Sequence, residues 1–193
     1  MQSATKADFA PYQTDALFLL IGTNPLPNYV AARLLAKNDG FVCLLHTPGR
    51  KGTAEVANRL QRKLEKDSPD LTVIRREIDE IDGDLISSKI TEIVKAIPST
   101  VESVGLNYSG GTKPMAVHTY HELSAAFPDG CFSYLDARSL KMVINRRDDP
   151  TQAIKVGRNV ELSLLDVLSL HGYSSYAVPG GNSRDTRFQR DWR

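Results

Sequence analysis

The chain has 193 residues, of which 41% are hydrophobic and 24% charged. This length and composition suit one well-packed domain, and they exclude a disordered chain, a fibrous chain and a nucleotide-binding domain joined to a second large catalytic one. Lys and Arg number 24 against 23 Asp and Glu, so no overall charge draws the protein onto long nucleic acid, and any bound anion must be held locally.

Short apolar runs alternate with amphipathic segments along most of the chain. Continuous apolar runs are typical of strands buried on both faces, whereas apolar residues at spacings of three and four are typical of helices. In chain order, the predicted elements are a strand at 16–21, a helix at 28–37, a strand at 41–45, a helix at 53–66, a strand at 71–74, a helix at 84–97, a strand at 101–108, a helix at 114–127 and strands at 131–135 and 141–145.

Strands that alternate with helices of this length predict an α/β fold, a Rossmann-like, doubly wound and mainly parallel sheet. The last two strands predict an antiparallel hairpin at one edge. Beyond Asp148 the pattern changes, and Ser163 to Gly172 predicts a short helix with Ser163 as N-cap and Asp166 in its first turn. We expect a flexible N-terminus over 1–14, one domain over 15–175, and a linker or tail over 176–193.

The two cysteines, Cys43 and Cys131, both lie inside apolar runs, where a free cysteine behaves as a small core residue. Two cysteines provide no disulfide framework. The segment 1–14 has no apolar signal region, and the longest apolar run, 16–21, is far below the roughly 20 residues that a membrane span needs. We therefore expect a cytoplasmic protein that is not bound to a membrane.

Ligands of open α/β sheets bind beyond the carboxyl ends of the strands, near the point where the strand order reverses. Two predicted loops lie there, 22–28 after the first strand and 109–113 after the fourth, and each ends at a helix N-terminus. Consecutive Gly110 and Gly111 allow close approach of a ligand to the backbone, and helix N-terminal amides favour phosphate. Lys113 adds a full charge. Further neutral donors are Asn107, Ser109 and Thr112.

Other interpretations of these loops stay open. The second loop is not a Walker motif, because Lys113 follows Gly-Gly-Thr and precedes Pro114, and no Gly-x-Gly-x-x-Gly follows the first strand. Gly110 and Gly111 also suit a plain tight turn between strand and helix. The Asn and Pro residues of the first loop are ordinary turn residues as well.

The remaining candidates are histidines and one arginine. His118 and His121 share a predicted helix face, but no Cys, Asp or Glu at suitable spacing completes a metal set, so we predict no metal site. His46 ends the second strand and either contacts a base or phosphate or belongs to a plain loop. Arg138 either reaches the same cleft or pairs with a neighbouring acid, and the second interpretation is favoured.

The segment Asn107-Tyr-Ser-Gly-Gly-Thr-Lys-Pro-Met115 resembles the Asn-x-Thr/Ser-Gly-Gly-Thr-Lys-x-Met segment of CRISPR-associated Rossmann-fold (CARF) domains, particularly those of Card1/Can2-type nucleases and related type III CRISPR ancillary effectors. The loop from Asn24 to Asn28 and the segment from Leu164 to Gly172 resemble the same group. The similarity spans roughly residues 15–175.

The resemblance implies a sensor domain whose homodimer binds one cyclic oligoadenylate, cyclic tetra-adenylate or less often hexa-adenylate, and allosterically controls a fused C-terminal effector. An isologous dimer has the two-fold symmetry of such a ring. No cofactor or metal is expected. The expected ligand-binding residues are Gly22, Thr23, Asn24, Pro25, Leu26, Asn28, His46, Asn107, Ser109, Gly110, Gly111, Thr112, Lys113 and Pro114.

Some relatives also cleave their ligand without metal, which leaves a stand-alone ring nuclease as the alternative function. Thr23, Asn24, Ser109 and Lys113 would then align a ribose 2′-hydroxyl with its phosphate and hold the developing charge. Neither loop offers an evident general base, so the sequence favours the sensor over the enzyme and leaves catalysis undecided.

Overall fold

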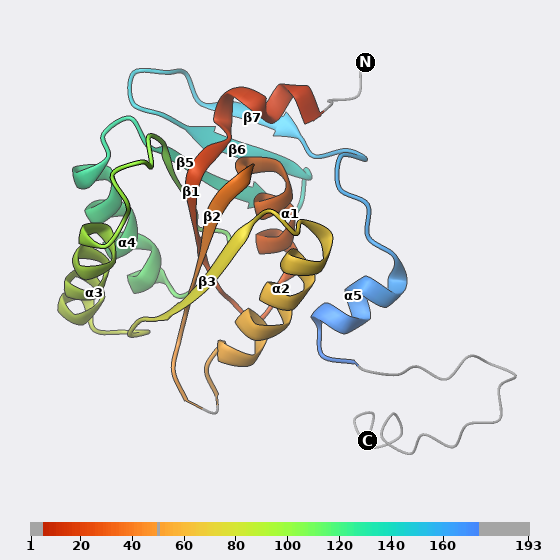
Figure 1. Ribbon diagram of the computed structural model, residues 1–193, viewed down its shortest axis with the longest axis horizontal. Coiled ribbons are helices and arrows are strands. Elements are labelled where there is room, and N and C mark those ends of the chain that lie inside the picture. Colours follow the sequence, from red (N-terminus) through yellow and green to blue (C-terminus); the bar gives the residue numbers. More distant parts are fainter. Residues whose placement is uncertain (1–5, 50, 174–193) are drawn as a thin grey trace, which may run out of the picture.

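The computed structural model describes residues 6–49 and 51–173, which form one sheet with helices on both faces (Figure 1). In chain order the elements are η1 (Lys6–Tyr12, a 3-10 helix), β1 (Thr14–Leu20), α1 (Leu26–Leu35), β2 (Ala36–His46), α2 (Ala54–Asp67), β3 (Thr72–Glu77), α3 (Gly83–Lys95), β4 (Val104–Asn107), α4 (Lys113–Ala126), β5 (Cys131–Asp136), β6 (Lys141–Asn145), β7 (Gln152–Lys155) and α5 (Leu164–Leu170).

The sheet has seven strands in the order β3-β2-β1-β4-β5-β6-β7. Every pairing from β3 across to β5 is parallel, and β6 and β7 continue the sheet in antiparallel pairs. The predicted fold is therefore confirmed: a Rossmann-like, mainly parallel sheet with an antiparallel edge. The edge is longer than the predicted hairpin, because β7 adds a third strand whose sequence carries little apolar signal.

Each face of the sheet has its own apolar core. Leu17, Leu19 and Ile21 of the β1 segment point toward α1, α2 and α5, whereas Phe18 and Leu20 point toward α3 and α4. Successive strand side chains alternate between the two faces, so a strand covered on both sides must be apolar at every position. This requirement is why residues 16–21 form an unbroken apolar run.

A flexible N-terminus was expected over 1–14, whereas the structure is ordered into regular elements from Lys6 onward. Residues Lys6–Tyr12 form η1 rather than a flexible segment, because the fully buried side chain of Phe9 packs in the core beneath α1. The predicted tail over 176–193 lies outside the described residues.

Both cysteines are free and buried as expected, and burial raises the pKa of the Cys43 thiol to about 12. Within 6–49 and 51–173, no helix has the length and apolar character to cross a membrane.

The short helix α5 begins as predicted, with Ser163 and Asp166 in a capping box. It docks on α2 through one shared cation: Lys63 Nζ lies 2.7 Å from Asp166 and 2.8 Å from Asp67. Asp67 in turn accepts a 2.6 Å hydrogen bond from the Tyr29 hydroxyl of α1. One chain of polar contacts therefore joins α1, α2 and α5.

Lys63 and the Ser163 cap hold the pKa of Asp166 at about 2, below the usual value near 4. A depressed pKa means that Asp166 stabilises the fold above pH 4 and that this contribution is lost as the pH falls from about 4 to about 2. We predict that Asp166→Asn lowers the free energy of unfolding at pH 7 by about 1 kcal/mol and removes that part of the acid dependence. Urea denaturation between pH 2 and 7 measures both effects.

The matched control is Asp149→Asn, which changes an exposed carboxylate in the turn before β7. Its free energy of unfolding at pH 7 is expected to stay within about 0.5 kcal/mol of the parent value. An Asp166→Asn variant with the parent's pH profile would contradict the assigned role of the Lys63 contact.

Candidate functional site

The strand order reverses between β1 and β4, which lie side by side in the middle of the sheet. Leu19 of β1 is in register with Asn107 of β4, so both strands end at the same edge of the sheet. From there the chain passes to α1 on one face and to α4 on the other. Ligands of this fold class bind at such a reversal.

The loops that follow these two strands touch through their backbones. A Cβ built at Gly110 would come within 2.7 Å of the Gly22 amide nitrogen and nearer still to the Leu20 carbonyl oxygen. A Cβ at Gly22 would lie 3.3 Å from the Gly111 amide nitrogen, and Gly111 has a left-handed φ of +76°. Glycine is required here by close approach and by backbone conformation. The two predicted loops therefore form one site.

The N-terminus of α4 faces this contact with amides that have no internal partner. Thr112 is the N-cap, and its hydroxyl accepts from the Met115 amide and donates to the Glu80 carbonyl at 2.7 Å. Across the described residues, the amides of Gly110, Gly111 and Lys113 donate to no protein acceptor. Unpaired amides at the positive end of a helix dipole favour an anion.

Lys113 opens α4, and its side chain is exposed at this edge. No carboxylate of the described chain lies within ion-pair distance of it. It therefore adds an uncompensated positive charge to the α4 amides, next to the exposed residues Thr23 and Asn24 of the first loop. The Asn24 carboxamide already accepts from the Leu26 amide at 3.1 Å, which orders the turn into α1.

Asn28 has a structural role inside the domain. Helix α1 begins two residues earlier than predicted, with Pro25 at the N-cap, so Asn28 lies in its first turn. Its buried Nδ2 donates to the Leu20 carbonyl at 2.9 Å and ties α1 to the end of β1. Its Oδ1 has no hydrogen-bond partner among the described residues and lies 3.2 Å from the Cβ position of Gly110. Asn28 thus supports the contact between the two loops from the interior of the domain.

Asn107 also points inward. Its side chain is fully buried, with Nδ2 donating to Ser133 Oγ at 3.0 Å and Oδ1 accepting from the Ser109 amide at 3.2 Å. The Ser109 hydroxyl accepts from the Leu135 amide at 2.7 Å. Asn107 and Ser109 therefore fix the second loop against β5, and Ser133 joins them as a supporting residue that its own sequence context did not indicate.

The histidine and arginine candidates lie at different depths. His46 is 8% exposed, and its Nδ1 lies 3.2 Å from the Thr47 carbonyl, which agrees with the plain-loop interpretation. Arg138 is exposed in the β5–β6 turn, where its amide donates to Asp136. His118 packs between α3 and α4, with Nδ1 3.2 Å from Ser87 Oγ.

The predicted ligand-binding set divides by exposure. The exposed members are Thr23, Asn24, Gly111 and Lys113. The half-buried members are Gly22, Leu26, Ser109, Gly110, Thr112 and Pro114. The buried members are Pro25, Asn28, His46 and Asn107. The exposed and half-buried members gather at the two-loop contact. Among residues 6–49 and 51–173, no three His, Cys, Asp or Glu side chains come together as metal ligands would.

The sequence matches no protein-family profile and no functionally described protein. Solved structures do share the fold. Can2 from Sulfobacillus thermosulfidooxidans in complex with cyclic tetra-adenylate superimposes with a TM-score of 0.66 and 21% identity, over 86% of this chain and 41% of that one.

A type III CRISPR defence DNA nuclease activated by cyclic oligoadenylate gives a TM-score of 0.53 and 20% identity, over 82% of this chain and 23% of that one. Enterococcus italicus Csm6 bound to cyclic hexa-2′-fluoro-hexa-dAMP gives a TM-score of 0.53 and 16% sequence identity, over 65% of this chain and 34% of that one. The chain thus spans less than half the length of each of these proteins, and over that part it shares their Rossmann-like fold.

We predict that Gly110→Ala disturbs both loops at once, because the added methyl group collides with the backbone of Leu20 and Gly22. The expected loss of unfolding free energy is about 1–3 kcal/mol. In two-dimensional NMR spectra, the amide resonances of Gly22 and Thr23 are expected to shift although they are distant in sequence.

Gly49→Ala is the control, since a Cβ at Gly49 meets no atom within 4 Å while φ is +78°. Gly110 itself has no positive φ, so the cost of its substitution comes from the collision, and Gly49→Ala is expected to leave the Gly22 and Thr23 resonances unshifted. Unshifted Gly22 and Thr23 resonances in Gly110→Ala would show that the loops do not touch.

Proposed function

We propose that this chain is a CARF sensor domain that binds a cyclic oligoadenylate at the β1–β4 junction. One observation carries the proposal. The Gly22 and Gly110 backbones bring two loops together, and the unpaired amides of Gly110, Gly111 and Lys113 share that edge with the Lys113 ammonium group. Such a set of donors recognises a phosphate in several directions at once.

The shape of the site supports binding by two copies of the chain. Neither loop lines any of the three cavities that we describe, and a single copy leaves Thr23, Asn24, Gly111 and Lys113 exposed. A cyclic tetra-adenylate has two-fold symmetry, and an isologous homodimer would place one α4 terminus on each of two equivalent phosphates. Tetra-adenylate fits this arrangement and is the ring we propose, with the Can2 complex as supporting likeness.

The same proposal gives the domain a regulatory role. The structurally similar proteins are more than twice as long as the stretch they share with this chain, which agrees with a sensor joined to an effector. Ring binding would shift the sensor toward its closed dimer only if that state binds the ring more tightly than the open one. Both the dimer and the effector belong to the proposal.

The central test is calorimetric titration of the protein with cyclic tetra-adenylate and with cyclic hexa-adenylate. Lys113→Ala is expected to weaken binding of the preferred ring at least about tenfold for each phosphate that Lys113 contacts, because a charge-assisted hydrogen bond is lost. The control is Lys95→Ala, which removes an exposed lysine at the C-terminal end of α3 and is expected to bind like the parent.

Failure of the parent protein to bind either ring would refute the proposed function. Equal affinity of the parent and Lys113→Ala would leave the function standing but move the site elsewhere. A stoichiometry of one ring per two chains is expected, and sedimentation of the complex checks it.

The alternative function, ring cleavage, is separated from sensing by turnover. Two of the four residues that would act already have backbone partners, which favours a sensor: Asn24 accepts from the Leu26 amide, and Ser109 accepts from the Leu135 amide of β5. We expect labelled cyclic tetra-adenylate to remain intact after hours with the protein in EDTA. Linear products that disappear in Lys113→Ala would instead establish a ring nuclease.

A further inference from the structure

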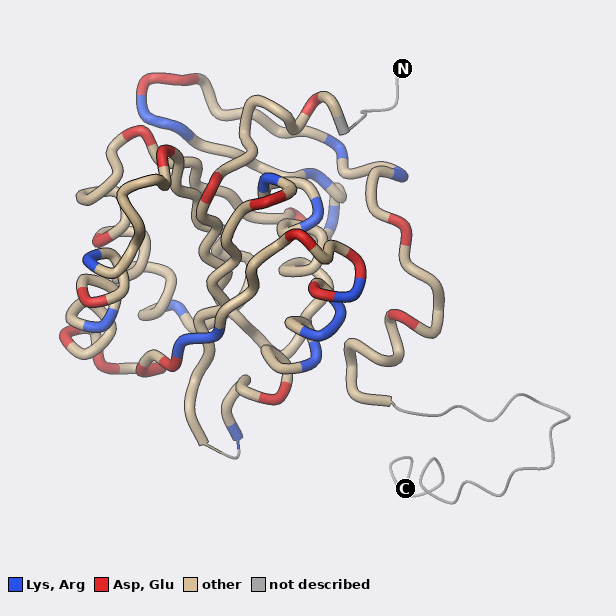
Figure 2. Tube along the Cα trace, viewed as in Figure 1, with Lys and Arg blue, Asp and Glu red and all other residues tan. Residues whose placement is uncertain are grey.

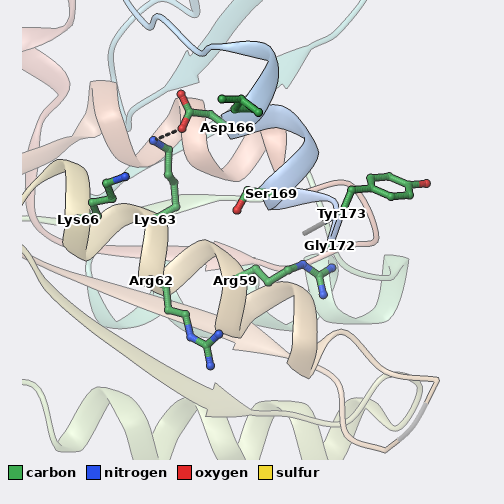
Figure 3. A pocket seen from close by; sticks show the side chains of 9 residues that line it. Arg59, Arg62, Lys63, Lys66, Asp166, Ser169, Gly172 and Tyr173 are labelled. Carbon is green, nitrogen blue, oxygen red and sulfur yellow. Dashed lines mark ion pairs between the residues drawn. The ribbon is translucent and has the colours of Figure 1, made fainter. Parts of the chain in front are cut away.

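A second cavity, separate from the two-loop site, opens between α2 and α5 (Figure 3). It has a volume of about 460 Å³ and is lined by Arg59, Arg62, Lys63, Lys66, Leu165, Asp166, Ser169, Gly172 and Tyr173. Its volume lies within the range of small-molecule sites. None of these residues belongs to the loops at the β1–β4 junction.

All four cations of the cavity come from α2. They lie at positions 59, 62, 63 and 66, and spacings of three and four place them along one side of the helix. Figure 2 shows this basic stretch of α2 next to α5, whereas acidic residues dominate the turn between β3 and α3 on the far side of the sheet. A protein with a net charge of only +1 therefore concentrates positive charge here.

Two of the cations are held in place by the fold. Arg59 Nε donates to the Leu170 carbonyl at 2.9 Å, and Lys63 is shared by Asp67 and Asp166. In Figure 3 the Arg59 guanidinium lies beside Gly172, where a Cβ would be only 3.2 Å from its central carbon. A side chain at position 172 would crowd the guanidinium, and glycine leaves that space free. Arg59 is thus oriented at the cavity with its terminal nitrogens available.

The other two cations have no acidic partner. Within the described part of the chain, no carboxylate lies within ion-pair distance of Arg62 or Lys66, and both side chains are exposed. Two carboxylates, Asp67 and Asp166, stand against four cations, so a net positive charge remains. An anion with about two negative charges would balance this excess of two positive charges.

We propose that the α2–α5 cavity binds a small ligand that carries a phosphate group. Arginine forks and lysine ammonium groups are the usual donors to phosphate oxygens, and the Ser169 hydroxyl points into the cavity from α5 as a neutral donor (Figure 3). Leu165 and Tyr173 at the margin provide apolar surface for the remainder of the ligand. A phosphate held by α2 and α5 together would also fix α5 on the domain.

The test is calorimetric titration with pyrophosphate and with adenosine 5′-monophosphate at constant ionic strength, on the full chain. The parent protein is expected to bind both, and Arg62→Gln/Lys66→Gln is expected to weaken that binding about tenfold or more. The double variant should fold normally, because within the described chain neither side chain makes an ion pair or hydrogen bond. Thermal unfolding in buffer alone verifies this.

The charge-matched control is Arg75→Gln/Lys95→Gln, which removes one arginine and one lysine outside the cavity and is expected to bind like the parent. Lys113→Ala is titrated as well, because the two-loop site also accepts phosphate. If Lys113→Ala alone abolishes binding of pyrophosphate, the phosphate belongs to the two-loop site and the cavity proposal is wrong.

Two further outcomes would also overturn it. One is the absence of pyrophosphate or nucleotide binding by the parent at millimolar concentration. The other is binding of a single-stranded oligonucleotide, without binding of the small ligands, that is lost in Arg62→Gln/Lys66→Gln. A loss of phosphate binding in the double variant with intact cyclic oligoadenylate binding supports the cavity independently of the proposed sensor function.

Discussion

The architecture depends on one constraint, the pairing of β1 with β4 in the centre of the sheet. Because the chain leaves these strands toward opposite faces, the loops that follow them must meet at the shared edge. The meeting is close enough that a side chain at Gly110 would collide with the backbone of the first loop, and one at Gly22 would be crowded by Gly110 and Gly111. The buried carboxamides of Asn28 and Asn107 then fasten each loop to a strand, so that packing inside the domain determines the geometry at its surface.

Much of this arrangement is readable from the chain alone. Unbroken apolar runs identify strands covered on both faces, and the run at 16–21 located β1 to within a few residues because burial leaves no other choice of side chain. Helix α4 was predicted to within one residue at each end, since a proline in the first turn is a local signal of a helix start. The capping box of α5 belongs to the same class.

The features that could not be predicted depend on partners far away in the sequence. A polar residue at the end of a strand can face the ligand or the interior, and Asn107 faces inward because Ser133, 26 residues later, accepts its hydrogen bond. Asn28 lies in α1, and its side chain reaches back to the Leu20 carbonyl, a partner that the sequence around Asn28 does not indicate. Phe9 anchors η1 by the same long-range packing, and β7 forms because β6 presents an open edge rather than because its own residues are apolar.

The backbone contact between the two loops also has a consequence for how the domain can move. Loops that are separated by side chains can shift by rotamer changes, but Gly22 and Gly110 have no side chain to rotate. A displacement of either loop must therefore carry the other loop with it, together with the first turns of α1 and α4. A movement at this edge therefore involves both loops together rather than either loop alone.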